Sequence, residues 1–273
     1  MSDNNSSENL NSLQVFKAIS VFISSIIIAG AGIFVTSQYN SNQLEISRNK
    51  DLATLIPQLG SQDATVRKFS AISLALYGKY AVPALMVTLD DENQDVRVAA
   101  VTSLSMIGEP AIRELTKTYQ DKCNSETKRS SGLYTLGRMR APNAYELAAS
   151  ALEDPKENPW VRKDAAMVMG FLKEKRSVER LLSVLRESKE RDVTLTSTIV
   201  WALGEIQDVP ITDDLISLLD HPDETVRIYI VTALGKIGNE STLSILSRVE
   251  SNDKSETVRQ AAKDASAWIK RRG

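Results

Sequence analysis

The sequence predicts an all-α protein, an α-solenoid of about seven stacked helix pairs preceded by one transmembrane helix. Three observations carry this prediction. A short pattern returns about every 32 residues through the last four-fifths of the chain, no alternating strand pattern competes with it, and an uncharged apolar run lies near the start. A fixed period of this length is typical of supersecondary units that bury their apolar faces only by stacking on one another.

Composition divides the chain into four segments. Residues 1–12 are rich in Ser and Asn and are predicted to be a disordered tail. Residues 13–38 contain the predicted transmembrane helix, 39–56 a helical juxtamembrane stalk, and 57–273 the solenoid. The stalk has neither Gly nor Pro up to residue 56, whereas Pro57 lacks a backbone donor and is expected to kink or end the helix.

The apolar run covers residues 18–36, which hold no charged side chain. As a helix it is about 28 Å long, which matches the hydrocarbon core of a bilayer. Two alternatives stay open: a signal peptide cleaved at residues 29–31, and a helix buried in the protein core. The prediction is a single-pass membrane protein, and the cations Arg48 and Lys50 after the run favour a cytoplasmic repeat domain.

A seam of small residues runs along one face of this predicted helix. Small residues allow two membrane helices to approach closely, so the seam favours a homo-oligomer. Its members are Ser25, Ala29, Gly32 and Thr36.

Each repeat unit is defined by an anchor residue, usually the Arg of a Val-Arg pair. An apolar residue follows seven positions later and another ten positions later, as Leu234 and Ile237 follow Arg227. This spacing places them on one stripe of a second helix, and a turn separates that helix from a first one. Asp or Asn before the second helix and Gly after it fit the ends of a helix. The anchors are Arg67, Arg97, Arg129, Arg162, Thr196, Arg227 and Arg259; the expected capping residues are Asp63, Asp95, Asn158 and Asp223, and the glycines are Gly78, Gly108 and Gly238.

The units, written D-x-x-VR-x-x-A-x-x-x-L-x-x-I-G, resemble HEAT repeats, in particular the short bacterial type also found in phycobilin lyases. The resemblance is weaker in the third unit, where Lys128 replaces Val, and weakest in the fifth, which has Leu195-Thr196. It implies that the second helices line a concave surface and that a turn Asp and the anchor Arg form a ladder between units. It therefore implies structural roles for Arg67, Arg97, Arg162, Arg227 and Arg259.

No catalytic group, metal site or cofactor is expected. His221 is the single histidine, and Cys123, the single cysteine, has no partner that would activate a thiol. The deoxyhypusine hydroxylases, which resemble this architecture, hold iron through several His-Glu pairs that this sequence does not contain. A net charge of −2 gives no reason to expect nucleic acid as a partner. The prediction is that the protein is not an enzyme.

A binding surface is predicted on the face of the second helices opposite the apolar stripe. Five positions after the anchor, the middle units carry Tyr134, Met167 and Trp201, and nine positions after it they carry Arg138 and Phe171. Aromatic, Met and Arg side chains are enriched at binding hot spots. Eight positions after the anchor stand Gly137, Gly170 and Gly204, small enough for a partner backbone to approach. The alternative is that the large side chains pack between neighbouring units.

A cluster of cations lies near these residues in sequence and would attract an acidic partner or anionic lipid. Its members are Lys128, Arg129, Arg138, Arg140, Lys163, Lys173, Lys175 and Arg176.

The sequence therefore predicts a membrane-anchored scaffold that binds a protein or peptide partner on its concave face, without catalysis. The alternative is a subunit of a phycobilin-lyase-like enzyme or a bilin-handling protein. A third interpretation is a sensor whose solenoid bends under load and signals through the stalk.

Overall fold

The computed structural model describes residues 37–38, 40–188, 192–206 and 211–272. The chain forms two compact units, residues 1–55 and 56–273. In the first unit the described residues from 40 onward are helical, and the helical conformation continues through Pro57 to Gln58. The predicted tail, the predicted membrane helix over residues 18–36 and its small-residue seam lie outside the described residues. Within the described ranges, no helix is both long enough and apolar enough to cross a membrane.

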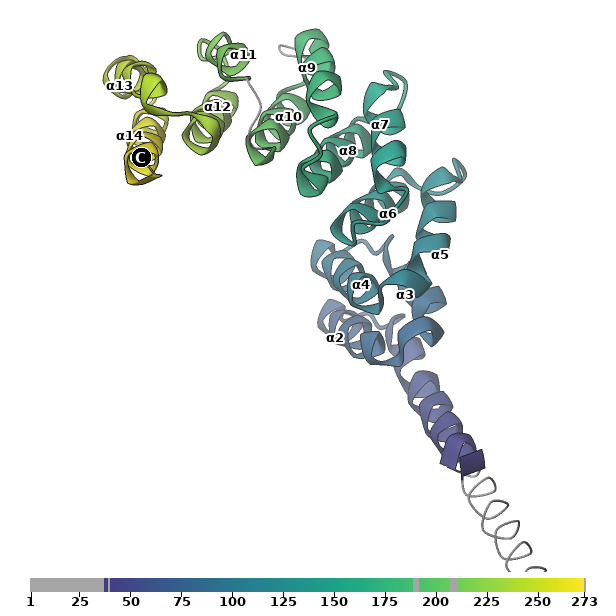
Figure 1. The fold of residues 1–273 in the computed structure, drawn as a ribbon. Coiled ribbons are helices and arrows are strands. Elements are labelled where there is room, and N and C mark those ends of the chain that lie inside the picture. The colour runs from purple at the N-terminus through teal and green to yellow at the C-terminus, as the bar shows by residue number, and fades with distance from the viewer. Residues whose placement is uncertain (1–36, 39, 189–191, 207–210, 273) are drawn as a thin grey trace, which may run out of the picture. The chain divides into compact units, whose positions relative to one another are not determined.

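The second unit is built from helices in the part of the chain that the structure describes, which confirms the all-α prediction (Figure 1). Each anchor lies in one of seven second helices: α2 (Ala64–Leu74), α4 (Gln94–Ile107), α6 (Glu126–Arg138), α8 (Pro159–Leu172), α10 (Val193–Glu205), α12 (Glu224–Ile237) and α14 (Glu256–Arg272). The first helices are α3 (Val82–Thr88), α5 (Glu109–Gln120), α7 (Ala144–Glu153), α9 (Ser177–Ser188), α11 (Thr212–Ile216) and α13 (Leu243–Asn252). The 3₁₀ helices η1 (Ala75–Tyr80) and η2 (Glu240–Thr242) complete the unit.

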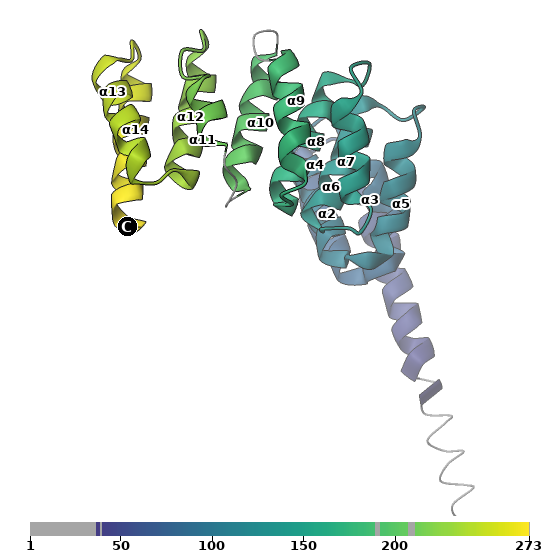
Figure 2. The same ribbon diagram turned by 45° about the horizontal axis from the view of Figure 1, so that its top comes forward.

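The helices stack in two layers, one of first helices and one of second helices (Figures 1 and 2). Each second helix packs against the next, from α2 and α4 through to α12 and α14, and from α4 onward each also packs against the first helix of its own unit. Side chains of the predicted apolar stripe fill the space between the layers. In α12, for example, Val226, Ile230 and Leu234 are fully buried. This arrangement is the predicted solenoid.

Short polar side chains begin the second helices as expected, with one correction. Asp63 and Asp223 accept hydrogen bonds from backbone N–H groups of α2 and α12. In α4, however, Asn93 caps the helix, and Asp95 lies inside the first turn. Asn93 has the extended backbone that a capping residue needs, with φ −85° and ψ 124°.

Two of the three predicted terminal glycines adopt positive φ angles. Gly78 has φ 55° and Gly108 has φ 77°, a region that side chains with a Cβ rarely enter. Gly238, at φ −70°, does not need this freedom.

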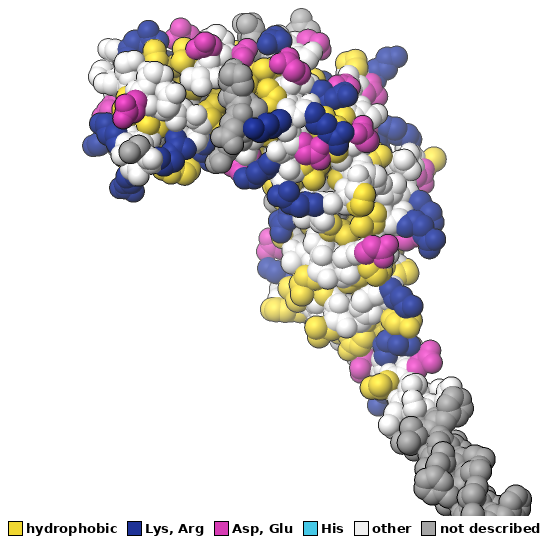
Figure 3. All heavy atoms as spheres, in the orientation of Figure 1, with side chains coloured by type: hydrophobic (Ala, Val, Ile, Leu, Met, Phe, Trp, Pro, Cys, Tyr) yellow, Lys and Arg dark blue, Asp and Glu magenta, His cyan; other side chains and the backbone are white. Residues whose placement is uncertain are grey.

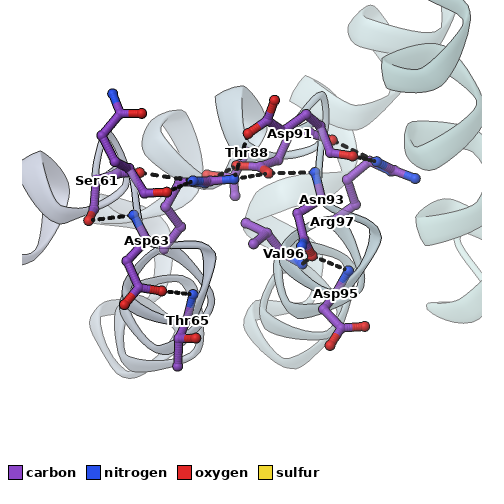
Figure 4. A network of polar contacts seen from close by, with 12 residues as sticks. Ser61, Asp63, Thr65, Thr88, Asp91, Asn93, Asp95, Val96 and Arg97 are labelled. Carbon is purple, nitrogen blue, oxygen red and sulfur yellow. Dashed lines mark hydrogen bonds and ion pairs between the residues drawn. The ribbon is translucent and has the colours of Figure 1, made fainter.

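The ladder between units is present, and its acid lies in the loop that precedes the next second helix (Figure 4). Arg67 Nε donates to Asp91 Oδ2 at 2.7 Å and its Nη2 donates to Asp91 Oδ1 at 2.9 Å. The backbone carbonyl of Asp91 in turn accepts from Arg97 Nη1 at 2.7 Å. Arg227 and Asp253 repeat this bidentate pair, and Arg259 donates to the Asp253 carbonyl. A fork of guanidinium and carboxylate therefore joins the first unit to the second and the sixth to the seventh.

The most buried pair of the ladder joins Arg129 to Glu157. Arg129 donates to both oxygens of Glu157, at 3.0 and 2.6 Å, and the two side chains are only 5% and 4% exposed. The sequence placed Arg129 in the surface cluster and did not single out Glu157, because Glu157 lies five residues before the next anchor, whereas Asp91 and Asp253 lie six residues before theirs. Arg97 and Arg162 donate to backbone carbonyls and make no ion pair that involves the described carboxylates.

Glu157 should make stability depend on acid pH. Hydrogen bonds from Arg129 lower the pKa of Glu157 from 4.5 to about 2. Burial alone would raise this pKa, but further hydrogen bonds from Lys122 and the Asn158 N–H also lower it. A carboxyl whose pKa is lower in the folded state stabilises the fold above its unfolded pKa, and this contribution is lost as the pH falls from about 4.5 towards 2. We expect Glu157→Gln to be less dependent on pH than the wild type in this window, as measured by urea denaturation.

The control for this experiment is Glu92→Gln, because the Glu92 side chain is 88% exposed. Glu92→Gln should keep the wild-type pH dependence. Equal slopes for the wild type and Glu157→Gln between pH 5 and pH 2 would contradict the assignment.

Candidate functional site

The five predicted binding residues lie on three consecutive second helices, and three of them touch. Tyr134 is on α6, Phe171 on α8 and Trp201 on α10. The ring centroids of Tyr134 and Phe171 are 5.4 Å apart at 74°, and those of Phe171 and Trp201 are 5.6 Å apart at 80°. Edge-to-face contacts of this kind stabilise the ring positions by about 0.5–1.5 kcal/mol each. We call Tyr134, Phe171 and Trp201 the aromatic row.

The aromatic row is half-buried, so its rings both contact one another and reach solvent. Met167 on α8 is also half-buried, and Arg138 at the end of α6 is exposed. These side chains can therefore pack between neighbouring units and still offer part of their surface to a partner. Each ring has one face or edge against a neighbour and part of its area free.

The glycines next to the row do not leave room for a partner backbone, which corrects the prediction. Gly137, Gly170 and Gly204 are buried against the next second helix. A Cβ at Gly170 would lie 2.5 Å from the Trp201 ring and 3.0 Å from Ala202 Cα. The physical reason is that consecutive second helices approach so closely here that only a hydrogen atom fits. These glycines determine how closely the units approach, and Gly170 determines where the Trp201 ring lies.

A pocket of about 310 Å³ opens beside the aromatic row at the ends of α6 and α8. Its charged wall holds more cations than carboxylates. The Lys173 ammonium lies 2.9 Å from Glu205, and Lys236 pairs with the same carboxylate. Burial raises the pKa of Glu205, but hydrogen bonds from Lys236 and Lys173 outweigh it and leave this pKa below its usual value. The lining residues are Gly137, Arg138, Arg140, Gly170, Phe171, Lys173 and Glu205.

The structure divides the predicted cluster of cations. Arg129 is buried with Glu157, Lys163 pairs with Asp164 at 2.7 Å, and Arg176 pairs with Glu146 at 3.0 Å. These three serve internal contacts. Arg138, Arg140 and Lys173 remain together on the pocket wall and are exposed.

The structure also reveals an apolar surface that the repeat pattern did not predict. Large apolar side chains on α2, η1 and α4 face solvent, with Phe69 62%, Leu76 83% and Met106 69% exposed. Figure 3 shows apolar side chains gathered over α2 and α4. A sequence signal existed, because these two units carry apolar residues outside the buried stripe. We call Phe69, Ile72, Leu76, Val98 and Met106 the apolar patch.

The residues considered for metal binding do not form a metal site. His221 is buried, and its Nδ1 accepts a hydrogen bond from the Asp223 N–H. Cys123 is exposed. Among the residues that the structure describes, no three His, Cys, Asp or Glu side chains converge on one point.

Comparisons with known proteins identify the repeat. A family model described as HEAT repeats matches residues 52–133, 128–200 and 194–267. The deoxyhypusine hydroxylase of Aspergillus oryzae is 30% identical over 134 residues, which are 46% of this chain and 39% of that enzyme. The chain thus spans about two-fifths of the length of this curated relative.

One solved structure shows the same fold, and a second is similar at a lower score. The YibA protein of Escherichia coli is similar with a TM-score of 0.50 and 16% identity, over 79% of this chain and 92% of that one. The complex of CpcE and CpcF of phycocyanin lyase from a Nostoc species gives a TM-score of 0.39 and 22% identity, over 76% of this chain and 73% of that one.

The expectation that the chain is not an enzyme is wrong as it stands. The relative from Aspergillus oryzae is an enzyme with detectable sequence identity to this chain. The expectation depended on the lack of a recognised catalytic motif. Repeat scaffolds, however, can bring functional side chains from several units together in space, and such a site leaves no short motif in the sequence.

Proposed function

The chain belongs to the HEAT-repeat family, and on that premise we propose that it holds a protein or peptide partner on the concave surface of its second helices. The observation that carries the proposal is the half-exposed aromatic row, which crosses three consecutive helices beside a pocket with cations on its wall. Rigid aromatic side chains next to Arg are the composition of binding hot spots. Met167 and Arg138 flank the row and belong to the same proposed site.

We further propose that residues 18–36 are a single-pass membrane anchor with the repeats on its cytoplasmic side. A 19-residue run without charge is long enough to span a bilayer, and this length supports the anchor. The partner is therefore sought with the full chain in its membrane.

The experiment compares crosslinked partners of the wild type with those of the double variant Tyr134→Ala, Trp201→Ala. Truncating two hot-spot rings should weaken the binding of a specific partner by about 2 kcal/mol or more, which lowers its affinity roughly thirtyfold. That partner should then be missing from the crosslinked set. Helix content by circular dichroism checks that the variant remains folded.

The matched control is Trp160→Ala. Trp160 is on the same helix as Phe171 but near its first residue, and it is 62% exposed. Trp160→Ala should retain every partner. A partner set that the double variant leaves unchanged would refute the site, and a purified protein with visible absorbance would favour the bilin-handling alternative instead.

A further inference from the structure

Two cations of the pocket occupy backbone positions that other units give to glycine. Eleven residues after their anchors, the first two units have Gly78 and Gly108, both with positive φ. The third and fourth units have Arg140 and Lys173 at this position, with φ 52° and 57°. The ψ angles differ, because Lys173 has ψ 31° and is left-handed, whereas Gly78 and Gly108 have ψ −134° and −136°. A residue with a Cβ is strained in the left-handed region, and strain of this kind is concentrated at functional sites.

Local contacts use these two cations only in part: Lys173 pairs with Glu205 at 2.9 Å, and Arg140 makes one long hydrogen bond. The Arg140 guanidinium has one hydrogen bond to the Leu172 carbonyl, at the long distance of 3.5 Å. Lys173 shares Glu205 with Lys236, so that carboxylate is already paired without it. Both side chains line the pocket together with Arg138, and the single carboxylate there leaves the wall with net positive charge.

Three residues of the apolar patch, Ile72, Leu76 and Met106, lie at the same repeat positions as the aromatic row. Ile72 is five residues after its anchor, as are Tyr134 and Trp201, and Met106 is nine residues after its anchor, as is Phe171. The helices α2, α4, α6, α8 and α10 pack in this order. One continuous surface therefore changes from apolar on α2 and α4 to aromatic and basic on α6, α8 and α10. An exposed apolar patch beside polar surface is typical of an interaction site.

We propose that this surface binds a protein segment that is apolar at one end and acidic at the other. The acidic end lies on Arg138, Arg140 and Lys173, and the apolar end lies on the apolar patch. This inference rests on the proposed function and adds the chemistry of the partner and its direction. With neighbouring helices roughly 8–10 Å apart, the surface from α2 to α10 is about 30–40 Å long, which about 12 extended residues span.

The test is a selection of random peptides of about 25 residues against the full chain in detergent micelles, a length that spans the surface in extended or helical form. Selected peptides are expected to carry Asp and Glu in one half and Leu, Ile or Phe in the other. Their affinities are then measured by fluorescence anisotropy on three variants of the full chain.

The first variant is Arg140→Gly, Lys173→Gly, which places at both positions the residue that the first two units carry. It removes charge while relieving backbone strain, so thermal stability should be unchanged or higher while peptide affinity falls about tenfold. The second is Phe69→Ser, Met106→Ser, which should also weaken binding about tenfold. The control is Lys156→Gly, Lys254→Gly, which removes two exposed loop cations elsewhere and should leave affinity unchanged.

The outcomes separate this inference from the proposed function. Peptides that need Trp201 and Tyr134 but have no acidic half, or that bind Arg140→Gly, Lys173→Gly normally, would overturn the inference and leave the proposed function standing. A selection without binding peptides would overturn both. Displacement of the peptides by a single-stranded oligonucleotide, with no effect of Phe69→Ser, Met106→Ser, would show that charge alone attracts ligands and would also overturn the inference.

Discussion

Replacing Arg129 by Met is expected to lower the free energy of unfolding by about 3 kcal/mol. The substitution leaves the carboxylate of Glu157 buried, with only the exposed Lys122 and one backbone N–H to compensate its charge. Removing one member of a buried pair is costly because the remaining charge has lost its solvation and its partner. Urea denaturation of the wild type and the variant at pH 7 measures the difference.

Two further variants identify the cause of this loss. Arg162→Met removes an anchor that donates only to the Leu152 carbonyl, and its effect should be about 1 kcal/mol. The double variant Arg129→Met, Glu157→Met removes both charges and should recover most of the stability. A loss at Arg162 as large as that at Arg129, or a double variant as unstable as the single one, would show that the ion pair is not responsible.

Replacing Gly170 by Ala is expected to lower the free energy of unfolding by about 1–3 kcal/mol, although alanine favours helices. The new methyl group would meet the Trp201 ring at 2.5 Å and Ala202 Cα at 3.0 Å. The backbone of α10 cannot yield as a flexible side chain can, so α8 and α10 must separate. Because Trp201 moves with α10, partner binding should weaken together with stability.

Gly132→Ala is the matched control, since Gly132 also lies inside a second helix. Its added Cβ would have no neighbour closer than the Leu115 carbonyl oxygen at 3.6 Å. It should therefore stabilise the protein by up to about 1 kcal/mol through helix propensity alone. Shifts of the same sign in thermal melts of the two variants would contradict the close approach of α8 and α10.

The buried stripe and the helix boundaries were predictable from the sequence because they depend on local order along the chain. Apolar residues spaced as Val226, Ile230 and Leu234 lie on one face of any helix. Gly108 likewise ends α4, and Gly78 kinks the chain inside η1, for a local steric reason. The period of about 32 residues then makes stacking the only way to bury these faces.

The candidate site was predictable in part. Helical periodicity placed Tyr134, Met167 and Trp201 on one side of the second helices, and all three are half-exposed there. The same argument failed for Gly137, Gly170 and Gly204, because angular position on one helix does not reveal how closely the next helix approaches. Helical periodicity also did not predict the apolar patch, because the exposure of Leu76 and Met106 depends on whether another part of the chain covers them.

By itself the sequence determined the α-helical repeat, its register and its buried stripe, because each follows from spacing along the chain and the 3.6-residue turn. Only the tertiary structure decided which charges pair and which side chains touch. The partner of Arg129 is 28 residues away at Glu157, and the ring beside Phe171 belongs to another helix. Contacts of this kind depend on the distance between stacked units, and that distance is set by packing in three dimensions.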